Sequence, residues 1–182
     1  KMPAAGGAYR LFAYVDDGKN GAAVANIPLY VDGPLAVQKG RPVKLPFAVY
    51  DEASNPPVFI ASGWIGNTKA MALKLDSKSN PHSGSTCTEI TFTGKDDWGG
   101  IIWQYPANDW GDLPACMDLS GAKSLSFWLR GELGGEEVSV NFGLLGKDKK
   151  FPDSATGALA NIKLTQGWTQ HKINLAGKDL SK

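Results

Sequence analysis

The segment Ser124-Leu125-Ser126-Phe127-Trp128-Leu129-Arg130 decides the fold class of this chain. Leu125, Phe127 and Leu129 alternate with the other four residues, a period of two that is typical of a β-strand with one buried face. Trp128 and Arg130 then share the opposite face, where they are candidates to line a concave sheet surface.

Short segments of the same character recur along the chain, separated by many of its 22 glycines and 11 prolines. Strands are predicted over Tyr9–Val15, Ile27–Val31, Pro46–Asp51, Lys69–Leu75, Thr86–Thr93, Gly99–Tyr105, Ser124–Arg130, Glu137–Phe142, Asn161–Leu164 and Thr169–Asn174. No segment longer than a turn or two is predicted to be helical. Many short strands joined by turns predict an all-β fold, a β-sandwich of the jelly-roll type.

Length and charge restrict the class of protein. The 182 residues suffice for one core but are few for two domains, so we expect a single domain over 1–182, with 1–8 as a linker or tag. The net charge of +1 is scattered, which gives no electrostatic reason for nucleic-acid or membrane binding, and no apolar run is long enough to span a bilayer. The Gly-, Trp- and Asn-rich composition is typical of extracellular proteins, and we expect a secreted monomer.

The stretch from Trp98 to Trp110 is the strongest functional signal. It holds three of the six tryptophans and one tyrosine, interleaved with Gly, Gln, Asn and Asp. Such a mixture suits a sugar, because the C–H face of a pyranose buries apolar area on an indole while its hydroxyls need hydrogen-bond partners. The alternative is that these tryptophans belong to a sandwich core. The Pro, Asn and Gly residues place part of the stretch in a loop, which favours binding.

The candidate sugar-binding residues combine aromatic platforms with polar partners. They are Trp64, Trp98, Trp110 and Trp128 for stacking, with Gln104, Asn108, Asp109 and Arg130 for hydrogen bonds. Trp103 alternates with Ile101 and Tyr105, which predicts a core position. Trp168 follows a glycine at a strand start and is predicted to be structural.

From about Phe47 onward, the chain resembles carbohydrate-binding modules of the galactose-binding-like jelly-roll type, which are attached to bacterial polysaccharide-degrading enzymes. The resemblance is carried by Ala61-Ser62-Gly63-Trp64-Ile65-Gly66, Trp98-Gly99-Gly100-Ile101-Ile102-Trp103-Gln104, Asp118-Leu119-Ser120-Gly121-Ala122-Lys123, Phe127-Trp128-Leu129-Arg130-Gly131-Glu132, and Gly167-Trp168 through Ile173-Asn174-Leu175. It implies non-catalytic binding of a polysaccharide, for which we expect a β-glucan or another plant cell-wall glycan.

One departure from this family pattern concerns the last strand. Such modules end on a Tyr-x-Asp type strand, and this chain stops at Lys182 before one. Residues Leu11–Val15 and Pro28–Asp32 resemble that missing ending, so a circular permutation is predicted, in which 9–45 supply the last strands and lie beside Thr169–Asn174. The alternative is that residues 1–45 belong to a preceding module.

A structural calcium ion is predicted where strand ends meet. Asp51 and Glu52 follow an apolar segment, and Asp32 ends the strand that the permutation makes their neighbour. Ca²⁺ takes six to eight oxygen ligands from carboxylates and carbonyls, and the family resemblance also implies calcium near this position. The loop Asp16–Gly21 is a second candidate but lacks the glutamate of an EF-hand, and it reads equally well as a hairpin turn.

Catalytic signals are weak. Neither His82 nor His171 has metal-ligand spacing, and His171 is expected at the surface. Glu132, Glu136 and Glu137 lie in a Gly-rich turn, where solvated charge is the default, so no catalytic residue is assigned. A jelly-roll lyase or glycosidase, and a structural or adhesive module without a sugar site, remain the alternative functions. The two cysteines, Cys87 and Cys116, are either buried thiols or a disulfide, which is slightly favoured.

Overall fold

The chain divides into two units, Lys1–Val37 and Gln38–Lys182, and each is described here by itself. The computed structural model describes residues 6–16, 22–33, 40–52 and 57–182. The first unit holds one antiparallel hairpin, in which β1 (Gly7–Asp16) pairs with β2 (Ala22–Val31) from Gly7 opposite Val31 to Asp16 opposite Ala22. Both strands predicted in this part of the chain are confirmed, and both are longer than predicted.

The second unit is made of short strands. They are β3 (Arg41–Pro42), β4 (Ile60–Gly66), β5 (Met71–Ser77), β6 (Cys87–Phe92), β7 (Gly99–Gln104), β8 (Met117–Asp118), β9 (Ser124–Leu129), β10 (Glu137–Phe142), β11 (Gly157–Lys163) and β12 (Thr169–Asn174). Within the described ranges the only helix is a single 3₁₀ turn over Thr68–Ala70. None of the described helical residues forms a span long and apolar enough to cross a membrane.

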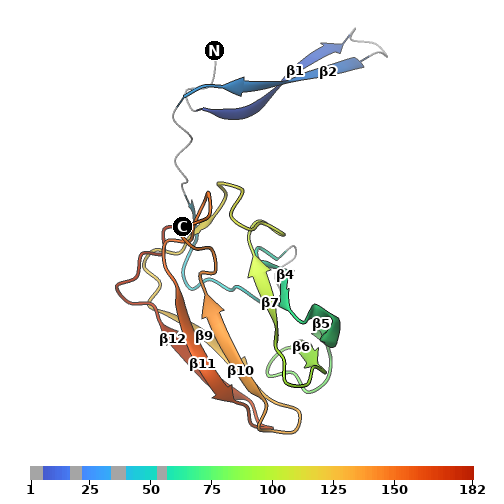
Figure 1. Ribbon diagram of the computed structural model, residues 1–182, viewed down its shortest axis with the longest axis vertical. Helices are drawn as coiled ribbons and strands as arrows, with labels where there is room; N and C mark the ends of the chain where they lie inside the picture. The colour runs from blue at the N-terminus through green and yellow to red at the C-terminus, as the bar shows by residue number, and fades with distance from the viewer. Residues whose placement is uncertain (1–5, 17–21, 34–39, 53–56) are drawn as a thin grey trace. The chain divides into compact units, whose positions relative to one another are not determined.

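The strands of the second unit pair mainly in antiparallel fashion. The antiparallel pairs are β4–β7, β5–β6, β9–β12 and β10–β11, and β3 pairs with β8 in parallel. Figure 1 shows β9 to β12 gathered in one group and β4 to β7 in another. The predicted all-β class is therefore confirmed, whereas the jelly-roll and galactose-binding-like subtype stays a prediction.

The core of the second unit lies on the inner face of β9 and β12. Ile173, Leu175 and Leu180 are buried there, and partly buried side chains pack against them, among them Leu125, Phe127, Val140, Phe142 and Leu159. Along β9, exposed and half-buried residues alternate as the sequence predicted, with Trp128 on the exposed face. The apolar face of this strand thus fixes its orientation, and it turns Trp128 outward.

His171 corrects one expectation. It lies opposite Phe127 in the β9–β12 pair, and the two rings stack with centroids 6.0 Å apart. Its Nε2 is 2.9 Å from the Thr169 hydroxyl. His171 is therefore half-buried on the inner face, and its expected surface position is wrong, because the alternation of β12 places it on the side of Ile173.

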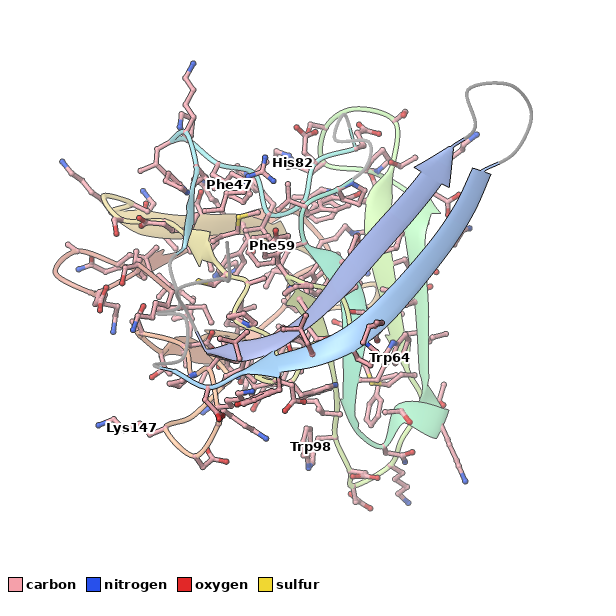
Figure 2. The ribbon with its side chains drawn as sticks, turned by 90° about the horizontal axis from the view of Figure 1, so that it is seen from above. Phe47, Phe59, Trp64, His82, Trp98 and Lys147 are labelled. Carbon is pink, nitrogen blue, oxygen red and sulfur yellow. The ribbon has the colours of Figure 1, made fainter. Side chains whose placement is uncertain are left out.

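Two differences from the predicted strands, at Pro46–Asp51 and at β4, have a local cause. Residues Pro46–Asp51 form no strand. Instead, the Phe47 ring packs edge-to-face on Phe59 at 6.1 Å, and Phe59 on Tyr105 at 6.2 Å (Figure 2 labels both phenylalanines). The apolar side chain of Phe47 thus packs in an aromatic cluster and not in a sheet. Pro46 also lacks the N–H that a central strand donates. Strand β4 is absent from the prediction because a bulge between Ala61 and Gly63 interrupts its alternation.

The cysteines do not support the disulfide. Cys87 is a free, half-buried thiol, and its Sγ lies 3.6 Å from the Ser79 carbonyl oxygen as a weak donor. The Cys87–Cys116 disulfide that the sequence slightly favours is therefore not formed.

The circular permutation concerns both units together. The described pairing joins β1 with β2 and β12 with β9. The role of residues 9–45 as permuted last strands depends on how one unit is placed against the other, and it stays a prediction. Within this part of the chain, residues 1–5, 17–21 and 34–39 lie outside the described residues.

Candidate functional site

Two exposed indoles lie near one end of the β4–β7 pair. Trp64 lies opposite Ile101, and two residues further along β4, Gly66 lies opposite Gly99. A methyl group added at Gly66 would lie 2.9 Å from Cε3 of Trp98, so the Trp98 ring covers that glycine. Trp64 lies two residues before this glycine on β4, so both indoles lie at the same end of the strand pair. Figure 2 shows both tryptophans at this end of the second unit.

This pair, named the Trp64–Trp98 surface, is open to solvent. Trp64 is 37% exposed and Trp98 is 61% exposed. The backbone holds the two strand ends together, since the Asn67 N–H donates to the Trp98 carbonyl oxygen at 2.8 Å. Gly66 has a φ of +69°, a conformation that favours glycine, and any side chain there would collide with Trp98. The close approach of the indole therefore depends on this glycine.

Trp103 adds a third ring to the same strand pair. It lies opposite Ala61, is half-buried, and alternates with Ile101 along β7. Because Ile101 lies opposite Trp64, this alternation places Trp103 on the same face as Trp64. The sequence showed that Trp103 and Ile101 share a face but assigned that face to the core. Only the register between β4 and β7 reveals that Trp64 lies on it.

Gln104 and Asn108 take part in a hydrogen-bond network beneath the loop that follows β7. The Gln104 amide is buried, with 7% exposure; its Nε2 donates to the Asp109 carbonyl oxygen at 2.6 Å and its Oε1 accepts from the Ser62 hydroxyl at 2.9 Å. The Ser62 hydroxyl in turn accepts from the Asn108 N–H at 2.9 Å. Ser62 occupies the bulge of β4, which explains how it reaches the loop. These side chains shape the loop that borders the aromatic surface.

Asp109 and Trp110 complete this loop. The Asp109 carboxylate is buried, and its Oδ1 accepts three backbone N–H groups, from Gly111, Asp112 and Leu113, at 3.2, 3.0 and 3.2 Å. Such an arrangement replaces the water that a buried carboxylate loses. Trp110 is half-buried between these residues. Among the polar candidates of the loop, Asn108 is the one with an exposed side chain.

A second loop meets the first near Gly111. The Phe151 N–H donates to the Gly111 carbonyl oxygen at 3.0 Å. Burial raises the pKa of the nearby Asp153 carboxyl, the Leu145 N–H that donates to its Oδ2 at 2.7 Å opposes the rise, and the Asp109 charge adds to it. Two carboxylates thus lie close enough to interact where the two loops join.

The remaining candidates, Trp128 and Arg130, belong to a separate place on the molecule. Trp128 is 41% exposed on the outer face of β9, opposite Gln170 of β12. Arg130 is half-buried, and its buried Nε makes no hydrogen bond to any residue that the structure describes. The His82 ring stacks on Trp128, and Figure 2 shows His82 well apart from Trp64 and Trp98. The single site expected from the sequence therefore divides into two aromatic surfaces.

The acidic residues predicted to hold calcium lie in both units. The Glu52 carboxylate accepts hydrogen bonds from the backbone N–H and the hydroxyl of both Ser85 and Thr86, at 2.8 to 3.1 Å. The bonds from Thr86 and Ser85 hold the pKa of Glu52 below its ordinary value. Three of these donors reach Oε2, so Glu52 has free lone pairs for an ion mainly on Oε1.

The calcium prediction is not decided by this geometry. Asp51 is exposed beside Glu52, and Asp32 belongs to the first unit. Among the residues that the structure describes, no three His, Cys, Asp or Glu side chains gather as a metal-binding group. The second candidate, Asp16–Gly21, lies outside the described residues after Asp16. Calcium bound by Asp32, Asp51 and Glu52 stays a prediction.

Comparisons with known proteins add no identification. No family model, curated protein or solved structure matches this chain. The resemblance to carbohydrate-binding modules therefore stays a prediction from the sequence.

Proposed function

We propose that this protein is a non-catalytic polysaccharide-binding module that holds its ligand by aromatic stacking on the Trp64–Trp98 surface. The observation that carries the proposal is the pair of exposed indoles near one end of β4–β7, at 37% and 61% exposure. Large exposed aromatic rings near one another offer apolar area that water covers poorly. A glycan supplies apolar C–H faces that can stack on such rings.

The surroundings of the two rings suit a neutral, hydroxyl-rich ligand. The exposed amide of Asn108 lies on a loop tied to β4 through Ser62, which brings a donor and an acceptor to the same strand pair. The net charge of +1 offers no field for a strongly anionic polymer. A β-glucan or another neutral plant cell-wall glycan is therefore the ligand class that we propose, for a protein secreted to where such polymers occur.

The buried polar side chains act as supports in this proposal. The Gln104 and Asp109 side chains form hydrogen bonds with backbone groups of the loop, so they hold the loop that carries Asn108 and Trp110. Rigid support of this kind raises affinity, because less conformational freedom is lost when the ligand binds.

Affinity electrophoresis against a panel of soluble glycans tests the function, followed by a reducing-sugar assay on the same mixtures. Retardation in a β-glucan or another neutral cell-wall glycan without new reducing ends supports the proposal. New reducing ends would make the protein a glycosidase or lyase. If no glycan in the panel retards the protein, and insoluble glycans do not remove it from solution, the module is structural or adhesive and the proposal fails.

A further inference from the structure

The loop between β5 and β6, residues 78–86, is anchored at both ends. At its start, Ser77 is fully buried, and its hydroxyl donates to the Glu89 Oε2 at 2.6 Å. At its end, Ser85 and Thr86 bind the Glu52 carboxylate through four hydrogen bonds. Anchors at both ends reduce the conformational freedom of the residues between them.

The centre of the loop lies against the outer face of β9 and β12. The Trp168 Nε1–H donates to the Asn80 carbonyl oxygen at 3.0 Å. The His82 ring stacks on Trp128, with centroids 4.0 Å apart and an interplanar angle of 24°, and meets Trp168 edge-on at 5.8 Å and 77°. Trp168 comes directly before Thr169, which pairs with Leu129, so both indoles lie at the same end of the β9–β12 pair.

The stacked imidazole occupies a specific place. A flat ring 4.0 Å above an indole and nearly parallel to it is in the position that the C–H face of a stacked pyranose would take. The same face of Trp128 cannot carry both. His82 therefore stands where a ligand of Trp128 has to bind.

We propose that the loop 78–86 is an autoinhibitory cover, in which His82 occupies the Trp128 indole and a glycan must displace it to bind there. This proposal rests on the proposed function, because it takes the displacing ligand to be the same neutral glycan. The Trp168–Asn80 hydrogen bond and the two anchors hold the loop in place, so displacement requires His82 to leave the indole and not the whole loop to unfold.

The first test needs no ligand. Limited oxidation of indoles with N-bromosuccinimide, read by peptide mapping, reports how accessible each tryptophan is. In His82→Ala the oxidation of Trp128 should become several times faster than in the wild type, while Trp98, far from this loop, keeps its rate. His82→Phe keeps a flat ring over Trp128 and should behave like the wild type. An unchanged rate of Trp128 oxidation in His82→Ala would refute the proposal that His82 covers this indole.

The second test uses the glycan that retards the wild-type protein. An aromatic pair contributes about 1 kcal/mol, so removal of the imidazole should strengthen the Trp128-dependent binding about fivefold. This gain should be present in His82→Ala, absent in His82→Phe, and absent in His82→Ala/Trp128→Ala. If Trp128 is oxidised faster in His82→Ala but the affinity for the glycan does not rise, the glycan does not have to displace His82, and the proposal is wrong. If no glycan binds the wild type at all, the proposed function fails instead, and the oxidation rates still decide whether His82 covers Trp128.

Discussion

The Trp64–Trp98 surface and the cluster of Trp128, Trp168 and His82 differ in whether the face of an exposed indole is open or covered. Trp64 and Trp128 are almost equally exposed, at 37% and 41%. Trp64 lies on the same strand as Gly66, whose bare backbone lets the Trp98 ring lie close beside it, whereas Trp128 has an imidazole ring on its face. Exposed area alone therefore does not say which indole is available, because a stacked neighbour can take the binding face and leave the edges open.

The largest effect is expected from removing the open surface. Each ring offers roughly 1 kcal/mol of stacking and roughly another 1 kcal/mol of apolar burial, and neighbouring contributions are not fully additive. Trp64→Ala/Trp98→Ala should therefore weaken glycan binding about a hundredfold, as measured by titration calorimetry or by mobility in glycan-containing gels.

A matched control comes from an apolar side chain elsewhere on the surface. Leu133 is 79% exposed and lies in the turn after β9. Leu133→Ala should leave both the affinity and the melting temperature unchanged. If the double tryptophan variant binds the glycan as well as the wild type, the Trp64–Trp98 surface is not the binding site.

Chelation should affect stability and leave the open surface intact. An ion at a hundred times its Kd contributes about 2.7 kcal/mol to the folded state, so EDTA should lower the melting temperature of calcium-loaded protein by several degrees. Asp51→Ala should lose this sensitivity, and glycan retardation at room temperature should persist. An unchanged melting temperature in EDTA, combined with a lower one in Glu52→Gln, would show that Glu52 serves only to hold Ser85 and Thr86.

Removing the buried amide of Gln104 should reduce the stability of the fold more than the affinity for the glycan. Gln104→Ala leaves the Asp109 carbonyl oxygen without its side-chain donor and removes one acceptor of the Ser62 hydroxyl, which costs about 1–2 kcal/mol in the free energy of unfolding. Denaturant titration measures this loss. Gln104→Ala with unchanged stability and abolished binding would instead make the amide a direct ligand contact.

The smallest effect concerns the junction of the two loops. Burial raises the pKa of Asp153 in the folded state, so its charge destabilises the fold fully at pH values above the raised folded pKa. The penalty shrinks as the pH falls below that value and is gone below the unfolded pKa. Asp153→Asn keeps an acceptor for the Leu145 N–H. It should raise the melting temperature slightly at pH 7, with a gain that shrinks towards pH 3. A gain that grows on acidification would contradict this sign.

The sequence predicted the strands best where alternation is regular. Glu137–Phe142 and Thr169–Asn174 are observed with the predicted bounds, because their apolar residues follow a period of two and turns flank them. Strand β4 escaped prediction because its bulge at Ser62 breaks that period. Pro46–Asp51 has the apolar residues of a strand, but they pack as an aromatic cluster.

The site was predictable in its chemistry and not in its arrangement. Tryptophans beside amides and carboxylates pointed to a sugar surface, but the sequence could not tell which polar groups face the solvent. Gln104 and Asp109 bind backbone groups of their own loop and, for Gln104, the Ser62 hydroxyl, and only the fold sets where these partners lie. The Trp168–Asn80 hydrogen bond joins residues 88 apart in the chain, and no local sequence pattern predicts it.

Protection of individual tryptophans from oxidation reports whether a bound glycan covers Trp64 and Trp98. The protein is oxidised with N-bromosuccinimide with and without the glycan that retards it, and each tryptophan is read by peptide mapping. We expect strong protection of Trp64 and Trp98 by the glycan, at concentrations that track its affinity, while an unrelated polysaccharide gives none. Equal oxidation of Trp64 and Trp98 in the presence and absence of the bound glycan would contradict this expectation.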